Sequence, residues 1–259
     1  LPLNTRCGQR GKCDGCRVDL DGEGGPWRSR RACELQADPL PASRVRLPET
    51  SRQASRMQVV EQFHLGVPWA HAPVEHTAGC PLGLAVDIGT TTAAVLLIDL
   101  SNGDVVGRGA GFNRQASMGD NVLTRINHCM ADGGALAKMQ QLVVRDTLGP
   151  LIGRALAESE HEPSDIGVAC IAANTTMLHL FAGVDPTPMG VSPFTPAFVE
   201  PRTLDASALG LPFRGPCHLL PSASAYLGAD AVVGLLTTGI AYDPEPAMFL
   251  DIGTNGEVI

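Results

Sequence analysis

The stretch Leu84-Ala85-Val86-Asp87-Ile88-Gly89-Thr90-Thr91-Thr92 runs from an apolar segment into a polar turn that contains glycine. A second apolar run, Ala93–Leu100, follows directly, and the turn residues Ser101-Asn102-Gly103-Asp104 separate it from a third run at Val105–Ala110. Short apolar runs bounded by Gly, Asn and Asp are typical of buried strands joined by tight turns. The stretch therefore predicts three consecutive strands at the start of a folded domain.

Helical and strand patterns alternate after the third strand. The proline-rich segment 185–216 interrupts them and is predicted to be irregular. With the first three strands, the predicted order is β-β-β-α-β-α-β-α followed by a further strand, which indicates an α/β fold. The expected elements are helices near 120–130 and 135–158, a strand at 167–173, a short helix at 175–181, a strand at 218–220, a helix at 223–238 and a strand at 247–252.

The last of these strands ends in Asp251-Ile252-Gly253-Thr254-Asn255-Gly256, which repeats the Asp-Ile-Gly-Thr of residues 87–90. In both copies an apolar strand ends in an aspartate and a Gly-Thr turn. Such a repeat implies two related lobes. We therefore expect residues 83–242 to form the first lobe and residues 243–259 to begin a second lobe that is truncated.

The repeated turn has the residues that a phosphate site needs. Glycine lets backbone N–H groups approach phosphate oxygens, and threonine hydroxyls add hydrogen-bond donors. Asp87 and Asp251 could hold Mg²⁺ through water or orient the attacking water, so they are the candidate catalytic residues. An ordinary hairpin turn would explain one copy, but two copies that each close an apolar strand favour phosphate binding. The candidate phosphate contacts are Gly89, Thr90, Thr91, Thr92, Gly253, Thr254, Asn255 and Gly256.

Four cysteines near the beginning of the chain form a separate pattern. Cys7, Cys13 and Cys16 lie in one glycine-containing segment, and Cys33 follows alone. Three thiolates from one loop and a fourth from a later segment are the plant-type arrangement for a [2Fe–2S] cluster. The alternatives are unrelated buried cysteines and a tetrahedral zinc site, although zinc sites usually bring two paired motifs. The remaining cysteines, which have no paired spacing, are predicted to be small core or surface residues, namely Cys80, Cys129, Cys170 and Cys217.

Residues 1–47 are predicted to form part of the cluster-binding domain, with strands at 17–20 and 45–47. The basic cluster Arg28–Arg31 is expected to be a solvated loop and not a binding site. Residues 48–82 lose periodicity and gain prolines, as a linker does.

The composition limits the classes of partner. The 259 residues carry a net charge of −8 and only 4% are aromatic, a balance that argues against a nucleic-acid surface. With 44% hydrophobic residues, the chain can bury a core in more than one domain. No apolar run approaches the roughly 20 residues that a bilayer-spanning helix needs. We expect a soluble cytoplasmic protein in a reducing compartment, without a nucleic-acid or membrane partner.

Together these motifs resemble the reductive activators of corrinoid proteins. Those proteins join a β-grasp, ferredoxin-like [2Fe–2S] domain to an actin-like, RNase H-like ATPase domain of the acetate and sugar kinase/Hsp70/actin superfamily. The most specific parts of the resemblance are the cysteine array and Asp251-Ile252-Gly253-Thr254-Asn255-Gly256-Glu257. The supporting segments are 83–100, Gly119-Asp120-Asn121-Val122, Asn174-Thr175-Thr176-Met177 and Leu227-Gly228-Ala229-Asp230.

The resemblance implies ATP-dependent reductive activation of a corrinoid methyltransferase protein. One electron would pass from the [2Fe–2S] cluster to Co(II) and regenerate Co(I), with ATP and Mg²⁺ bound between the two lobes. It also implies an upstream electron donor and allows a homodimer. Asp120 and Asn174 would either lie near the site or simply cap helices, and the sequence does not separate these alternatives.

The chain departs from the family pattern in several places. Gln9 and Asp14 stand where the cluster loop commonly has glycine. The family's middle domain is expected to be missing, with residues 48–82 as its only counterpart. Because the chain starts at Leu1 and stops at Ile259, just after the second Asp-Ile-Gly-Thr motif, we expect a fragment without the adenosine-binding half of the second lobe.

Two other functions stay open. A small-molecule kinase with a redox-sensing cluster would use the same paired turns and would also need an acceptor pocket with a catalytic carboxylate. A ferredoxin-like electron carrier would use the ATPase-like region only to recognise a partner and would not hydrolyse nucleotide.

Overall fold

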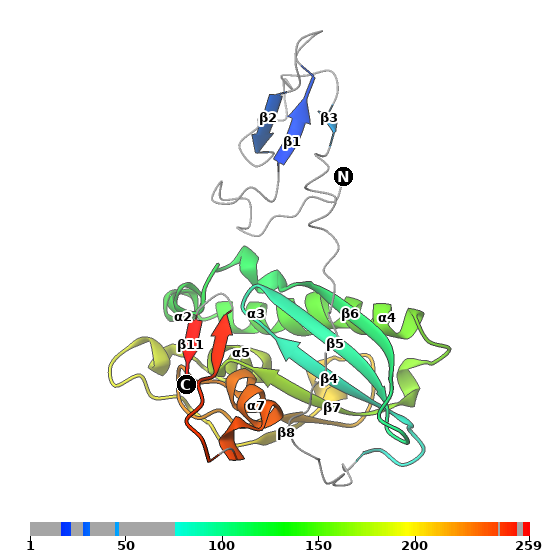
Figure 1. Cartoon of the computed structure of the whole chain (residues 1–259). Coiled ribbons are helices and arrows are strands. Elements are labelled where there is room, and N and C mark those ends of the chain that lie inside the picture. The colour runs from blue at the N-terminus through cyan, green and yellow to red at the C-terminus, as the bar shows by residue number, and fades with distance from the viewer. Residues whose placement is uncertain (1–16, 22–27, 32–44, 47–75, 243, 253–255) are drawn as a thin grey trace.

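A six-stranded mixed sheet in the order β6-β5-β4-β7-β9-β8 forms the centre of the protein (Figure 1). The computed structural model describes residues 17–21, 28–31, 45–46, 76–242, 244–252 and 256–259. The three predicted consecutive strands are confirmed, and they pair as an antiparallel meander. They are β4 (Leu82–Ile88), β5 (Thr92–Asp99) and β6 (Val105–Phe112).

The second half of the sheet is built on the other edge of β4. There β7 (Ile166–Ala173) runs parallel to β4, and β9 (Pro216–Leu219) runs parallel to β7. The edge strand β8 (Arg202–Asp205) pairs antiparallel with β9 and leads into α6 (Ala206–Leu209). The prediction that 185–216 is irregular is therefore wrong for β8 and α6. The alternation within β8 is too short to detect among prolines, and the strand forms because β9 offers it an open edge.

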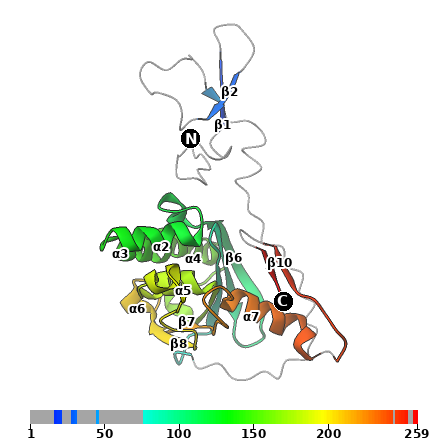
Figure 2. The same cartoon turned by 90° about the vertical axis from the view of Figure 1, so that its left-hand side faces the viewer.

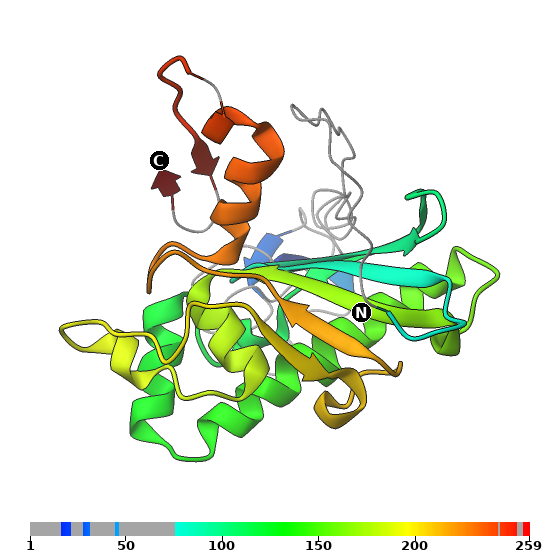
Figure 3. The same ribbon diagram turned by 90° about the horizontal axis from the view of Figure 1, so that it is seen from below.

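Helices cover the sheet unequally on its two faces. Figures 2 and 3 show α2, α3, α4 and α5 on one face, whereas α7 and β10 stand on the other. The predicted short helices α2 and α5 are confirmed. The bounds are α2 (Val122–Ala131), α3 (Ala135–Val143), α4 (Gly149–Ala157), α5 (Thr175–Ala182) and α7 (Ala229–Thr238).

The long helix predicted over 135–158 is interrupted by a π-helical turn, η3 (Val144–Leu148), between α3 and α4. Pro150 follows within α4, and a proline has no N–H to donate to the preceding turn and crowds its carbonyl. The wider turn is also held by Thr147, whose hydroxyl donates to the Leu142 carbonyl (2.8 Å) and accepts from the Arg114 N–H (3.0 Å). The interruption is therefore a consequence of proline chemistry together with a contact from a distant segment.

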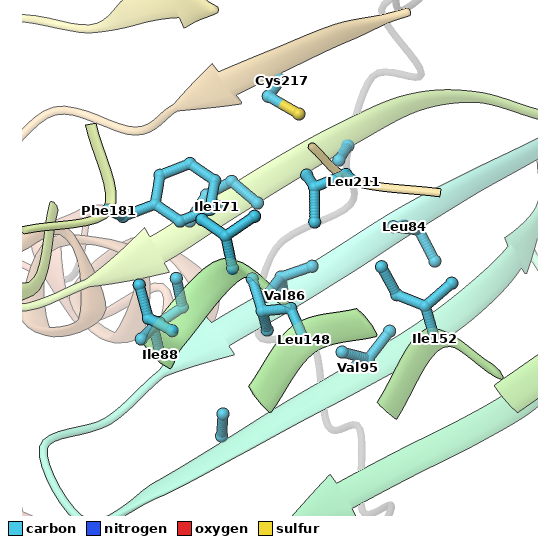
Figure 4. Packing of buried hydrophobic residues seen from close by; sticks show 14 of the residues in the cluster. Leu84, Val86, Ile88, Val95, Leu148, Ile152, Ile171, Phe181, Leu211 and Cys217 are labelled. Carbon is cyan, nitrogen blue, oxygen red and sulfur yellow. The ribbon is translucent and has the colours of Figure 1, made fainter. Parts of the chain in front are cut away.

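The hydrophobic core lies between the sheet and the helices α3, α4 and α5. Leu84, Val86 and Ile88 alternate along β4 and are at most 4% exposed, as a strand with one covered face requires. Figure 4 shows them against Val95, Ile171, Leu148, Ile152 and Phe181. Burying each such side chain stabilises the fold by about 1.5–3 kcal/mol, so this layer anchors the strand end at which the candidate site lies.

Glycines on β6 let α4 lie directly against the sheet. A Cβ atom at Gly107 would come within 2.0 Å of the Ala155 carbonyl oxygen, and one at Gly109 within 2.2 Å of the Leu151 carbonyl oxygen. Both obstacles are helix backbone, which cannot rotate away as a side chain can. The helix and the strand would have to separate to admit any side chain at these positions.

We predict that Gly107→Ala destabilises the protein by about 3 kcal/mol or more, since overpacking against backbone has to displace α4. Gly153 on α4 is the matched control, because nothing lies within 4 Å of a Cβ placed there. Gly153→Ala should stabilise the helix by about 0.5–1 kcal/mol. Urea unfolding followed by circular dichroism measures both changes. Equal stability of the two variants would show that α4 does not approach β6 as closely as described.

Other predicted elements differ from the structure mainly in their ends. The helix predicted from residue 223 begins at Ala229, because Gly228 is its N-cap and residues 223–227 close a turn in which the Ala223 N–H donates to the Leu227 carbonyl (2.8 Å). The strand predicted at 247–252 begins at Leu250 and pairs with a following strand in a two-stranded sheet. These strands are β10 (Leu250–Ile252) and β11 (Gly256–Val258).

A separate three-stranded antiparallel sheet has the order β2-β1-β3. The predicted strands at 17–20 and 45–47 are confirmed as β1 (Arg17–Leu20) and β3 (Val45–Arg46). The prediction that Arg28–Arg31 is a loop is wrong: it forms β2 and pairs along the length of β1. A short basic run is compatible with an edge strand as well as with a loop, so charge alone did not distinguish the two.

The remaining short helices of the described residues are η2 (Arg114–Ser117), η4 (Pro163–Asp165), η5 (Thr187–Gly190) and η6 (Ile240–Tyr242). Within the part of the chain that the structure describes, no helix has both the length and the apolar character that crossing a membrane requires.

Candidate functional site

Asp87 lies near the carboxyl end of β4, where its Cα pairs with Ala94 of β5 and Ala172 of β7. Its side chain points to the face of the sheet opposite the core. The carboxyl group reaches solvent, yet surrounding protein removes much of its water. Desolvation, followed by the charges of Asp230 and Asp251, raises the pKa of Asp87 to about 6. A carboxylate whose pKa is strongly raised in this way is a candidate functional residue.

Three further carboxylates from the α7 side of the sheet interact with Asp87 or with one another. Asp230 lies in the first turn of α7, and its pKa is raised by desolvation and by the charge of Asp251. Asp251 on β10 stands opposite Glu257 on β11, whose pKa is raised by desolvation and by the charges of Asp251 and Asp230. The predicted pair of Asp87 and Asp251 is thus close enough to interact, and Asp230 and Glu257 enlarge the group.

This concentration of negative charge favours a cation. Among the described residues, no three His, Cys, Asp or Glu side chains converge closely enough to hold a metal ion directly. Mg²⁺ commonly keeps several of its waters and binds proteins through one or two carboxylates. The carboxylates around Asp87 could hold a hydrated Mg²⁺ in this way.

The turn after Asp87 is anchored at each of its carbonyl groups. The Gly89 carbonyl accepts from Nδ2 of Asn113 (2.9 Å), and the Thr91 carbonyl accepts from the backbone N–H of Asn113 (2.9 Å). The Thr90 carbonyl accepts from Nη2 of Arg125. A Cβ at Gly89 would come within 2.7 Å of the Thr92 carbonyl oxygen, so the turn needs glycine there. Thr92 itself begins β5.

The sequence left open whether Asn174 caps a helix or lies near the site, and the structure shows that it does both. It caps α5 by accepting from the Met177 N–H (2.9 Å), and its Nδ2 donates to the Thr90 hydroxyl (3.0 Å). It reaches Thr90 because β7 runs parallel to β4, so that the carboxyl ends of the two strands lie side by side. Asn174 is therefore both a helix cap and part of the candidate site.

Asp120 occupies a different position, at the start of α2. Its Oδ1 accepts from Nδ2 of Asn121 and from the Thr124 hydroxyl, each at 3.3 Å, while Asn121 itself is the N-cap. The charge of Asp120 also acts on Arg125. Asp120 thus supports the α2 end of the site.

The second Asp-Ile-Gly-Thr copy also ends a strand of an antiparallel hairpin. Ile252 pairs with Gly256 across that hairpin, as Ile88 pairs with Ala93 in the first copy. The predicted phosphate contacts Gly253, Thr254 and Asn255 lie outside the described residues, whereas Gly256 is exposed at the start of β11. The four predicted cluster ligands, Cys7, Cys13, Cys16 and Cys33, also lie outside the described residues.

Sequence reasoning did not select Arg125, Asn113 or Asp230 as site residues. Asp230 lay within a motif of the family resemblance and could have been chosen as an acidic residue that follows a glycine at a helix start. Arg125 and Asn113 gave no comparable signal. A charged residue on an amphipathic helix is ordinarily assigned to the solvent face, yet Arg125 is fully buried.

The fold and the site define an α/β protein whose mixed sheet carries an anchored turn and an acidic strand end. The chain belongs to the RACo middle region family, whose sequence model matches residues 82–243. The match begins at β4, so the middle region is the mixed-sheet domain itself. The expectation that this region is missing, with residues 48–82 as its counterpart, is therefore wrong. The Asp-Ile-Gly-Thr strand and turn mark the start of the middle region.

Two relatives extend the comparison. The corrinoid activation enzyme RamQ of Eubacterium limosum is 29% identical over 178 residues, which are 68% of this chain and 30% of RamQ. A solved structure of a reductive activator for a corrinoid, iron-sulfur protein is 36% identical and superposes with a TM-score of 0.68. That match covers 70% of this chain and 29% of the solved chain. This chain thus spans about 30% of the length of either relative.

Proposed function

We propose that this chain is part of an ATP-dependent reductive activator of a corrinoid protein. One observation carries the proposal: in a member of the RACo middle region family, the turn after Asp87 has three successive carbonyls held by buried donors. In a trans peptide the N–H points away from the C=O that precedes it, so anchoring these carbonyls also fixes the directions of the N–H groups in the turn. Fixed amide groups beside a carboxylate suit the binding of a magnesium nucleotide.

In this proposal the two turns share the phosphates. Residues 89–92 and 253–256 supply backbone and hydroxyl donors, and the glycines allow the close approach that phosphate oxygens need. Asp87 and Asp251 hold Mg²⁺ through water or orient the attacking water. The carboxyl of Asp87 is mostly ionised only above pH 6, and a cation would offset its repulsion with Asp230 and Asp251.

The cysteine array provides the electron site of the proposal. Four thiolates at this spacing fit a plant-type [2Fe–2S] cluster, which would supply one electron at a time. Cys7, Cys13, Cys16 and Cys33 are its proposed ligands. The electron would go to the Co(II) of a docked corrinoid methyltransferase protein, with an upstream donor to refill the cluster. A homodimer is compatible with this scheme.

ATP is needed because the transfer is uphill. Plant-type clusters have potentials near −400 mV, and Co(II) in a corrinoid is harder to reduce. Each 59 mV of shortfall corresponds to about 1.4 kcal/mol for one electron. Nucleotide turnover that changes the closure of two lobes around Asp87 and Asp251 would shift the docked corrinoid protein towards a more reducible state, through differential binding.

The direct test uses the full-length protein, a corrinoid protein and a chemical reductant. We expect the corrinoid absorbance to change from the Co(II) to the Co(I) spectrum only when MgATP is present, because the uphill transfer has no other driving force. Reduction at the same rate without ATP would favour the electron-carrier function. Phosphorylation of a sugar or another small acceptor would instead favour the kinase.

A further inference from the structure

Arg125 on α2 is fully buried, and within the described residues its hydrogen-bond acceptors include no carboxylate. Its Nε donates to the Gly119 carbonyl (3.0 Å), its Nη1 to Oε1 of Gln115 (3.0 Å) and its Nη2 to the Thr90 carbonyl. Desolvation lowers the pKa of Arg125 to about 10, and the charge of Asp120 opposes this. Burying a charged guanidinium costs folding free energy. Its position beside the turn after Asp87 therefore suggests a role other than packing.

The acceptors of Arg125 belong to a larger buried network. Asn113 is fully buried, and its Nδ2 donates both to the Gly89 carbonyl (2.9 Å) and to Oε1 of Gln115 (3.3 Å). Gln115 in turn donates through Nε2 to the Met139 carbonyl of α3 (2.9 Å). The network therefore ties the turn after Asp87 to two helices that cover the core face of the sheet (Figure 2).

The motif Asn174-Thr175-Thr176-Met177 approaches the same turn from α5. Nδ2 of Asn174 donates to the Thr90 hydroxyl (3.0 Å), and the Met177 sulfur lies 2.9 Å from Nη1 of Arg125. The carbonyl and the hydroxyl of Thr90 are thus fixed by two different helices. These two hydrogen bonds restrict rotation of both the backbone and the side chain of Thr90.

The hydrogen bonds to the carbonyls also fix the directions of the neighbouring amide N–H groups. In a planar trans peptide, the C=O and the following N–H point in opposite directions. Holding the Gly89 carbonyl therefore orients the Thr90 N–H away from Asn113. Holding the Thr90 carbonyl likewise orients the Thr91 N–H away from Arg125 and α2.

We propose that Arg125 is a positioning residue for phosphate binding. Its hydrogen bond to the Thr90 carbonyl directs the Thr91 N–H towards the phosphates of a bound nucleotide. This inference rests on the proposed nucleotide site. An arginine suits the role because its planar fork sends N–H groups to three separate acceptors at once. The three N–H groups of a lysine all come from one nitrogen, so they could not span the acceptors on Gly119, Gln115 and Thr90 that the guanidinium reaches from three nitrogens.

The test compares nucleotide with nucleoside in the full-length protein. In Arg125→Lys we expect ATP affinity to fall about ten- to a hundredfold, the range for losing a well-placed hydrogen bond to a charged group. Adenosine has no phosphates, so its affinity should change less than twofold. Titration calorimetry measures both ligands, and circular dichroism reports whether the variant remains folded. A residue with only a structural role would not separate the two ligands.

Two further variants make the comparison decisive. Arg154→Lys is the matched control, because Arg154 also donates to a backbone carbonyl, that of Ala110 (3.1 Å), but from the exposed face of α4. It should leave both affinities unchanged. Gly119→Ala crowds Arg125 without removing it, since the new Cβ would lie 2.8 Å from the Cγ of Arg125 and 2.7 Å from Oγ1 of Thr124. This variant serves if Arg125→Lys does not fold, and it should also lose ATP affinity selectively.

The outcomes distinguish this inference from the proposed function. If the unmodified protein binds no ATP, the proposed function fails and this inference fails with it. If the unmodified protein binds ATP and a folded Arg125→Lys or Gly119→Ala binds it equally well, only the role of Arg125 is overturned. Equal losses for ATP and adenosine would also overturn it, because they would indicate a general structural effect.

Discussion

Replacing Asp87 with asparagine in the full-length protein is expected to lower ATP-dependent reduction of the corrinoid about a hundredfold or more, the scale on which catalytic carboxylates act. Asparagine keeps the size of the side chain and removes the charge that would hold hydrated Mg²⁺ or orient water. The spectrum of the iron–sulfur cluster should not change, because the proposed cluster ligands are remote in sequence and none is shared. The corrinoid absorbance with and without ATP measures the loss, and Asp251→Asn should behave in the same way.

Asp99 provides a matched control for this experiment. It ends β5 on the same sheet, and its Oδ1 accepts from the backbone N–H and the hydroxyl of Ser101 (2.8 and 2.7 Å). Asp99→Asn should keep full activity, since that carboxylate only supports a hairpin turn. Cys16→Ser should show the reverse defect, with nucleotide binding retained and electron delivery lost. An Asp87→Asn protein that still couples ATP to reduction would remove Asp87 from the proposed site.

Replacing Cys33 with serine is expected to bleach the cluster almost as completely as replacing Cys13. The anaerobically purified full-length protein should be brown and contain about two irons and two sulfides per chain, as four thiolates at this spacing predict. Removing any one ligand leaves an under-coordinated site. Iron and sulfide analysis with visible absorbance measures the effect, and stoichiometric zinc in place of iron would contradict it.

The four cysteines within the described residues offer a control for the proposed ligands. As predicted, they are buried or partly buried and unpaired: Cys80, Cys129, Cys170 and Cys217. Desolvation raises the pKa of Cys129 to about 11 and that of Cys217 to about 12, so both remain thiols at neutral pH. Cys80→Ser should leave the cluster intact, since a serine hydroxyl can keep the hydrogen bond from Cys80 Sγ to the Ser164 carbonyl.

Sequence patterns correctly predicted the helices and strands whose signals lie within a few neighbouring residues. The apolar runs of β4, β5 and β6 and the Asn174 cap of α5 are signals contained within a few residues, and all were found, whereas α2 is capped by Asn121 and not by Asp120. The errors have causes outside such windows. The strand β8 needs the edge of β9, β2 needs β1, and the π-helical turn depends partly on Arg114, which reaches Thr147 from a distant segment.

For the candidate site, the sequence by itself determined the strand that carries Asp87 near its end, the glycine turn after that strand and the repetition of both at Asp251. These are properties of contiguous residues. Only the tertiary structure decided which side chains hold that turn. Arg125 and Asn174 stand 35 and 84 residues from Thr90, and the fold alone brings their donors to its carbonyl and hydroxyl. A carbonyl accepts from any donor that the fold places in line with it. Neither residue type nor spacing in the sequence therefore predicts which donor that will be.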